Sequence, residues 1–276
     1  MHTGPESSAG GELVRDPPDT QGEATAGDEL WPASPDQRYG QRRARSTVVP
    51  HTQRHGVVIN LCFHGIGAPG RPLEPDEDLY WIEPTQFDEF LAVIRTDPRI
   101  RITFDDGNAS DAEYALPALL RHGLRGNFFV VAGRLDQPGS LSRAEVRELT
   151  RAGMSVGSHG LEHRPWRTVS DEDLEAELGQ AAEIIGATVG QPVREVACPF
   201  GSYDRRVLRA IRRGGFDRVY TADGGAAARS DAWLQSRYTI RGRDTPAVIE
   251  RLRSAPQGNG VEPALRSIKG IIKRLR

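Results

Sequence analysis

The sequence predicts an α/β fold in which parallel strands form a distorted seven-stranded (β/α) barrel. After residue 55, apolar strand-like segments alternate with amphipathic helical segments about seven times, which is typical of a parallel sheet with right-handed crossovers. Polar residues follow the C-terminal ends of nearly all these strands, and a barrel collects those ends at one face. A doubly wound sheet would instead gather its site at a single switch point, so we favour the barrel.

The chain of 276 residues divides into three predicted regions. Residues 1–50 are rich in Gly, Pro, Ser and acidic residues and have no apolar periodicity, so we expect a disordered N-terminal tail. Residues 55–255 carry the barrel. Residues 256–276 are expected to form a basic amphipathic C-terminal helix. We expect this helix to pack on the barrel, and contact with an anionic membrane surface is the alternative.

Composition narrows the possible functions and compartments. The formal net charge of −2 gives no overall positive field for nucleic acid, and only 7% of the residues are aromatic. Cys62 and Cys198 lie in apolar strand-like segments, which indicates reduced thiols. The first residues lack the basic start and apolar core of a secretory signal, and no apolar run is long enough to cross a membrane. We therefore expect a cytoplasmic protein that does not bind nucleic acid.

The first half of the barrel region alternates between apolar runs and helical patterns. Expected strands cover residues 57–63, 100–104, 127–131 and 154–157, and expected helices cover 85–95, 110–122 and 142–153. Thr85 is the predicted N-cap of the first helix, and Ser142 with Glu145 forms a predicted capping box. Pro117 is expected to kink or shorten the second helix, and Gly123 is expected to end it.

The second half continues the alternation. Expected strands cover residues 194–198, 218–222 and 234–240, and expected helices cover 170–185, 204–213 and 245–253. Ser170 is the predicted N-cap of the first of these helices.

Two adjacent carboxylates, Asp105 and Asp106, end the strand at 100–104 and precede Gly107. Neighbouring carboxylates repel each other, and a bound cation relieves that repulsion. One Asp could then ligate the ion while the other acts as a base beside it. Asp-Asp-Gly is also a common turn sequence, and taken alone it favours a simple turn.

His159 and His163 follow the strand at 154–157 with a spacing of four residues. If residues 158–163 form a helical turn, both imidazoles project to one side. Two histidines and one carboxylate suit zinc or a similar divalent ion and leave positions open for water and substrate. The alternative is one surface histidine and one core histidine. The pair lies on the same predicted face as the Asp pair, which favours metal binding.

The segment Thr103-Phe104-Asp105-Asp106-Gly107, taken together with Ser158-His159-Gly160-Leu161-Glu162-His163, resembles the first two motifs of the polysaccharide deacetylase family. This family is carbohydrate esterase family 4, the NodB-homology domain, and the resemblance covers roughly residues 57–242. It implies a distorted barrel that hydrolyses an N-acetyl group, usually on an amino sugar, with the help of a divalent metal ion such as zinc. The expected partner is therefore an N-acetylated carbohydrate.

The resemblance also implies roles for individual residues. Asp105 would be the general base, and Asp106, His159 and His163 would hold the metal. The late motif that usually carries a leaving-group histidine is absent. One branch of the family has a histidine after the first strand instead, and His64 matches that placement, so we assign it as the general acid. The alternative is a structural histidine.

The third motif of the family matches Ala197-Cys198-Pro199-Phe200-Gly201, although a simple turn is the alternative reading. In the family its aromatic residue, here Phe200, supplies a backbone N–H to the oxyanion. The motif usually begins with an arginine that holds the base, whereas this chain has Ala197, which resembles an Ala-x-Pro-aromatic-Gly branch. Arg237 could replace that arginine by pairing with Asp105, and a surface salt bridge is the alternative.

Two further interpretations compete with sugar deacetylation. The first is a related amidase that acts on a non-sugar C–N bond, because the barrel is not tied to one substrate. The second is an inactive, metal-containing carbohydrate-binding protein, which the missing arginine at Ala197 allows. Asp105 argues against inactivity, because a carboxylate beyond the metal ligands is not needed merely to hold a metal.

Overall fold

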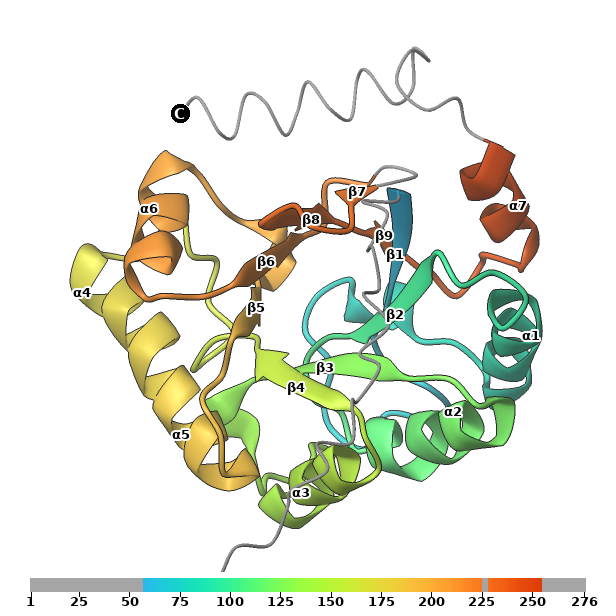
Figure 1. The fold of residues 1–276 in the computed structure, drawn as a ribbon. Coiled ribbons are helices and arrows are strands. Elements are labelled where there is room, and N and C mark those ends of the chain that lie inside the picture. The colour runs from blue at the N-terminus through green and yellow to red at the C-terminus, as the bar shows by residue number, and fades with distance from the viewer. Residues whose placement is uncertain (1–56, 225–227, 255–276) are drawn as a thin grey trace, which may run out of the picture. The chain divides into compact units, whose positions relative to one another are not determined.

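The structure, a computed structural model, describes residues 57–224 and 228–254. The expected tail at 1–50 and the expected C-terminal helix at 256–276 lie outside the described residues. Within them, parallel strands form a nearly closed barrel with helices around its outside (Figure 1). The prediction of a distorted (β/α) barrel is confirmed. None of the described helices is long and apolar enough to cross a bilayer.

One sheet contains all nine strands of the described residues, and every pairing except that of β7 with β1 is parallel. Around the barrel the order is β1, β2, β3, β4, β5, β6 and β8, with β9 beside β1 and β7 antiparallel to β1. The strands are β1 (Val57–Phe63), β2 (Ile100–Phe104), β3 (Gly126–Val130), β4 (Ser155–Ser158), β5 (Glu195–Ala197), β6 (Arg218–Thr221), β7 (Ala228–Arg229), β8 (Leu234–Ser236) and β9 (Tyr238–Thr239).

A single chain segment, residues 234–239, closes the barrel, and we call it the closing segment. Its first part, β8, pairs with β6, and its second part, β9, pairs with β1. At the junction the Arg237 N–H donates to the Thr221 carbonyl at 3.1 Å, and three residues later the Ile240 N–H donates to the Cys62 carbonyl at 2.8 Å. The single strand predicted at 234–240 is therefore two short strands, because the segment changes partners at Arg237.

Helices connect the strands at the positions that the sequence predicts. They are α1 (Pro84–Ile94), α2 (Leu116–His122), α3 (Arg143–Arg151), α4 (Asp171–Glu175), α5 (Ala181–Val189), α6 (Arg205–Arg213) and α7 (Ala247–Ser254). Residues 111–115 precede α2 as a π-helical stretch, and residues 176–180 join α4 to α5 in the same way. The helix predicted at 170–185 thus continues to Val189 with a π-helical stretch inside it.

Most of the predicted helix ends are confirmed. Ser142 Oγ accepts from the Glu145 N–H at 3.2 Å, and the Glu145 carboxylate accepts from the Ser142 N–H at 2.7 Å, which completes the capping box. Ser170 caps α4 through its side chain. Gly123 ends α2 with a left-handed φ of 66°.

The start of α1 differs from the prediction that Thr85 is its N-cap. The helix begins at Pro84, and Glu83 is the N-cap in a capping box with Gln86. Proline suits the first turn because its ring presets the helical φ and its missing N–H would have no helical partner there. Pro117 lies in the first turn of α2 for the same reason, so it shortens the regular helix as predicted.

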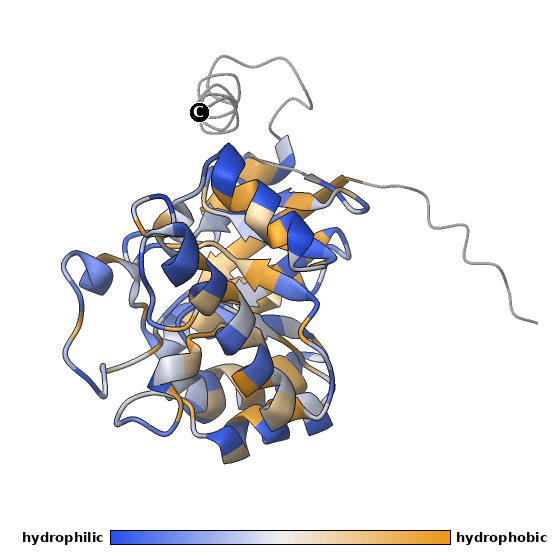
Figure 2. Cartoon of the chain, turned by 90° about the vertical axis from the view of Figure 1, so that its left-hand side faces the viewer, coloured by the Kyte–Doolittle hydropathy of each residue, from blue (hydrophilic) through white to orange (hydrophobic). Residues whose placement is uncertain are grey.

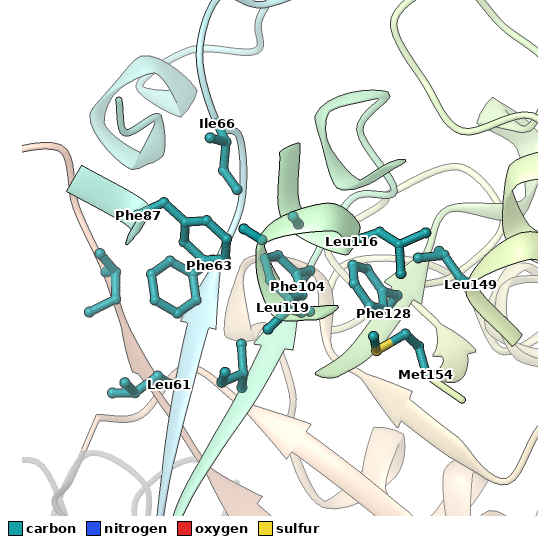
Figure 3. Packing of buried hydrophobic residues seen from close by; sticks show 14 of the residues in the cluster. Leu61, Phe63, Ile66, Phe87, Phe104, Leu116, Leu119, Phe128, Leu149 and Met154 are labelled. Carbon is teal, nitrogen blue, oxygen red and sulfur yellow. The ribbon is translucent and has the colours of Figure 1, made fainter. Parts of the chain in front are cut away.

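The main apolar core lies between the outer face of the barrel and the helices. Phe104 and Phe128 stack with ring centroids 4.5 Å apart, and Phe63 meets Phe87 of α1 edge to face at 5.2 Å (Figure 3). Burying one such ring contributes roughly 1.5–3 kcal/mol. Figure 2 shows the matching pattern of hydropathy, with apolar strands inside and helices that carry both apolar and hydrophilic residues.

The inside of the barrel is more polar than its outer face. Asn60 Nδ2 donates to Gln235 Oε1 at 3.0 Å, and Asn127 Nδ2 donates to Glu195 Oε2 at 2.9 Å. The buried Phe129 ring packs on Tyr220 with centroids 4.9 Å apart, and a Cβ added to Gly157 would lie 2.6 Å from the Phe129 ring. These side chains fill the inside of the barrel. The polar residues that follow the strands therefore gather at the C-terminal mouth, above a filled interior.

Candidate active site

The mouth of the barrel brings the predicted metal ligands together. His163 Nε2 lies 3.3 Å from Asp106 Oδ1, and His159 Nε2 lies 3.6 Å from the same atom. One ligand atom from each of the three residues fits within 4.8 Å of the others, which is an arrangement that could hold a metal ion. The three side chains come from loops after β2 and β4.

The segment 158–163 does not form the helical turn that the histidine spacing suggested. His159 directly follows β4, and the chain then takes left-handed φ values of 87° at Gly160 and 55° at His163. The two imidazoles nevertheless lie side by side with centroids 5.1 Å apart. Their proximity therefore comes from an irregular loop and not from helical periodicity.

A buried glutamate holds this loop in place. Glu177 is 2% exposed, and its carboxylate accepts the backbone N–H groups of Leu161 at 3.0 Å and Glu162 at 3.1 Å. A Cβ at Gly160 would lie 2.4 Å from Glu177 Oε2, so a glycine is needed there. Glu177 could not be recognised from the sequence, because it looks like an ordinary acidic residue of an amphipathic helix.

Hydrogen bonds at Nδ1 orient both imidazoles. His159 Nδ1 lies 3.0 Å from the Ala197 carbonyl, and His163 Nδ1 lies 3.0 and 3.1 Å from the two carboxylate oxygens of Glu74. Both partners can only accept, so each Nδ1 carries a proton and each Nε2 keeps its lone pair for the site. Burial also lowers the pKa of His159 to about 4, which keeps that ring neutral.

The surroundings of Asp106 fit a cation. Asp106 is 3% exposed, and its Oδ1 forms no hydrogen bond within the described part of the chain, although both Nε2 atoms face it. Buried polar atoms are rarely left in this state. A carboxylate and two imidazole nitrogens are also a donor set that zinc accepts. The residues present therefore fit a divalent ion.

Asp105 forms a buried ion pair with Arg237. Arg237 Nη1 donates to Oδ1 and Nη2 donates to Oδ2, both at 2.6 Å, and the two side chains are only 5% and 1% exposed. The alternative of a surface salt bridge is therefore wrong. Burial alone would raise the pKa of Asp105, but the guanidinium outweighs it and holds that pKa well below its usual range. Asp105 Oδ2 also lies 3.8 Å from His159 Nε2.

His64 follows β1, and one of its ring nitrogens lies within 4.8 Å of a carboxylate oxygen of Asp105. Its ring stacks on Tyr80 with centroids 5.1 Å apart, and it is partly exposed. Burial acts to raise the pKa of Asp106, and the charge of His64 is the largest influence that brings this pKa below its usual value. His64 is therefore close to the candidate metal site without being one of its three ligands.

Phe200 lies beside His163 with ring centroids 4.4 Å apart, and 58% of the residue is exposed. Its φ is 55°, a left-handed value that costs energy for any residue other than glycine. Of the five non-glycine residues with positive φ in the described chain, three meet here: Asp106, His163 and Phe200. Such clustering of backbone strain is typical of functional sites.

Residues 93–219 match the family model described as polysaccharide deacetylase. This part of the barrel is similar to the polysaccharide deacetylase family. The matched residues contain the Asp pair, the His pair and Phe200, but neither His64 nor Arg237. The roles of those two residues therefore depend on their positions at the mouth of the barrel.

Two curated relatives match part of this chain. A Bacillus subtilis protein, YxkH, whose assignment as a polysaccharide deacetylase is provisional, is 24% identical over 142 residues, covering 51% of this chain and 50% of that protein. Chitin deacetylase 1 of Cryptococcus neoformans is 27% identical over 158 residues, covering 55% of this chain and 32% of that protein. The chain thus spans half or less of the length of these relatives.

Solved structures of other proteins share the fold. The deacetylase PplD of Streptococcus pyogenes, solved in complex with acetate, has a TM-score of 0.63 at 19% identity, over 71% of this chain and 98% of that chain. IcaB of Ammonifex degensii has a TM-score of 0.60 at 20% identity, over 72% of this chain and 97% of that chain. At these identities the similarity establishes the barrel fold alone.

Proposed function

We propose that this protein is a metal-dependent hydrolase that removes the N-acetyl group from an amino sugar or glycan. One observation carries the proposal. The ligand atoms of Asp106, His159 and His163 meet beside a second carboxylate, Asp105, whose orientation Arg237 fixes with two hydrogen bonds. Three protein ligands are enough to hold zinc, the ion that we propose. The Asp105 carboxylate is therefore free to act as a base.

A divalent ion bound there would lower the pKa of a water molecule and polarise the acetyl carbonyl. Asp105 is the proposed base that takes the proton from the attacking water. The ion pair with Arg237 keeps Asp105 ionised and aims its carboxylate, which is the task that an arginine in the third motif would otherwise perform. Arg237 is thus a positioning residue in this proposal.

The other two proposed roles concern the acetyl oxygen and the departing nitrogen. The backbone N–H of Phe200 would donate to the carbonyl oxygen as negative charge develops on it. His64 would protonate the nitrogen, because an amine is a poor leaving group until it gains a proton. Its position beside the Asp pair, held by the Tyr80 stack, supports this assignment.

An N-acetylated carbohydrate is the proposed substrate, and the names of the polysaccharide and chitin deacetylases that the chain resembles support this choice. Both cysteines are buried thiols, which supports our proposal of a reducing compartment such as the cytoplasm. An acetate-release screen on zinc-loaded protein, across N-acetylated glycans, lipid-linked sugars and nucleotide sugars, tests the proposal. Release from none of them would favour the binding protein, and release only from non-sugar amides would favour the alternative amidase.

The purified protein is expected to hold about one divalent ion per chain, and His159→Ala should lose it, because two ligands bind zinc far more weakly than three. Elemental analysis of both proteins gives the answer. His122→Ala is the matched control, since His122 belongs to α2 and faces Asp88 at 3.4 Å on the outside of the barrel. Equal metal content in wild type and His159→Ala would remove the proposed site.

His64→Ala is expected to lower turnover of an N-acetyl sugar without releasing metal. The loss should be smaller on an aryl acetate, whose leaving group needs no proton. Comparing kcat on the two substrates separates protonation from binding. If both reactions slow equally, His64 binds or orients the substrate and the proton comes from another group.

A further inference from the structure

A carboxylate lies directly behind one of the proposed metal ligands. Glu74, on the loop between β1 and α1, places its two oxygens 3.1 and 3.0 Å from His163 Nδ1. On the opposite side of the ring, Nε2 faces Asp106 at 3.3 Å. Arg134, which follows β3, forms an ion pair with the same Glu74 carboxylate. Segments from two other parts of the chain therefore meet behind His163.

We propose that Glu74 is a positioning residue that prepares His163 to bind the metal. It accepts the Nδ1–H bond, fixes the ring orientation and leaves the Nε2 lone pair directed at the site. A carboxylate behind an imidazole also makes the ring a stronger donor to the ion. The inference depends on the proposed metal site and adds a residue that the deacetylase motifs in this chain do not include.

A competing contact must be weighed, because Arg134 Nη2 lies 3.4 Å from His163 Nδ1. If that group donated to Nδ1, the ring proton would sit on Nε2 and the imidazole could not ligate an ion. The two Glu74 oxygens lie closer to Nδ1 than Arg134 Nη2 does, and carboxylate oxygens can only accept a hydrogen bond. Arg134 Nη2 also already donates to Glu74. Arg134 therefore holds the Glu74 carboxylate, and that carboxylate accepts the Nδ1–H of His163.

The two histidine ligands differ in what holds them. The Nδ1 of His159 bonds to a backbone carbonyl, that of Ala197, which no side-chain substitution removes. The Nδ1 of His163 depends on the Glu74 side chain. A substitution at Glu74 therefore removes the orienting bond from one ligand and leaves the other ligand intact.

Glu74 is itself held in place by its own loop. Its N–H donates to Glu77 Oε2 at 2.8 Å, and Glu77 is 8% exposed and paired with Arg71. Arg71 in turn donates to Asn108 Oδ1 at 2.8 Å, which ties the loop to the segment after the Asp pair. Glu74 belongs to none of the ligand clusters found in the described residues, so it supports a ligand and does not act as one.

The test measures zinc affinity on the full chain without substrate, by competition with a chromophoric chelator. Glu74→Ala is expected to bind zinc about 10–100-fold more weakly than wild type, the range typical of losing a residue that orients a metal ligand. Glu74→Gln should lose less, because its amide oxygen still accepts the Nδ1–H. Asp78→Asn is the matched control. Asp78 is exposed on the same loop, and its substitution removes one negative charge but should leave the zinc affinity unchanged.

Wild-type affinity in Glu74→Ala would overturn the inference and leave the proposed function standing. A loss of zinc as complete as in His163→Ala would make Glu74 a ligand, which also overturns it. A wild-type protein that binds no zinc would contradict the metal site and the proposed function together. If Glu74→Ala does not fold, Glu74→Leu, which also cannot accept the Nδ1–H, decides, and an affinity equal to that of both wild type and Asp78→Asn would overturn the inference.

Discussion

Replacing Arg237 by alanine is expected to destabilise the protein by about 3–5 kcal/mol, because the substitution leaves the Asp105 carboxylate buried without its partner. The pair has two 2.6 Å bonds, and neither side chain is more than 5% exposed. Unfolding in urea measures the loss. The catalytic rate per folded molecule should fall as well, because the proposed base loses the group that orients it.

Two further variants serve as comparisons for Arg237→Ala. Arg121→Ala breaks an exposed pair with Asp88 and should cost less than about 1 kcal/mol. The double variant Arg237→Ala with Asp105→Asn should be more stable than Arg237→Ala alone, since no buried charge remains unpaired. A loss for Arg237→Ala as small as that for Arg121→Ala would show that the buried pair carries little free energy.

Asp105→Asn is expected to reduce deacetylation by about a hundredfold or more while the protein keeps its metal. An amide cannot accept a proton at neutral pH, and Asp105 is not among the three proposed ligands. The measurement pairs kcat with metal content per folded chain, because Arg237 loses its ionic partner in this variant. Asp88→Asn, which makes the same chemical change on α1, serves as the control.

An active Asp105→Asn protein would assign the role of base to another residue. Loss of metal in this variant would instead indicate that Asp105 contributes to the site as a ligand. Its Oδ2 lies 3.8 Å from His159 Nε2, so the two outcomes need separate measurement.

The parts of the fold that depend on neighbouring residues could be predicted from the sequence. Alternating apolar runs marked the strands, and the Ser142 capping box marked a helix start, because both patterns reflect contacts within a few residues. Thr85 failed as a cap because Glu83 and Pro84, immediately before it, suit a helix start better. Such choices between adjacent caps lie at the limit of what local patterns decide.

The parts of the candidate site that depend on distant contacts could not be predicted. The spacing of His159 and His163 suggested a helical turn, but Glu177 determines the loop from a different element. The sequence placed Arg237 on the last strand. Its burial could not be predicted, because it depends on how the closing segment pairs with β6 and β1. Glu74 gave no signal, because it lies in a loop whose conformation no periodicity describes.

The closing segment links completion of the fold to completion of the charge pair. Without residues 234–239, β6 and the C-terminal half of β1 would each lack backbone partners on one edge, and Asp105 at the mouth would lack the Arg237 guanidinium. Open strand edges invite pairing with other chains, and an uncompensated carboxylate resists burial. A barrel without this segment should therefore stay open between β6 and β1, with water around Asp105. Arrival of residues 234–239 supplies backbone partners to both edges and the missing positive charge in one step. The same six residues thus complete both the sheet and the ion pair that orients the proposed base.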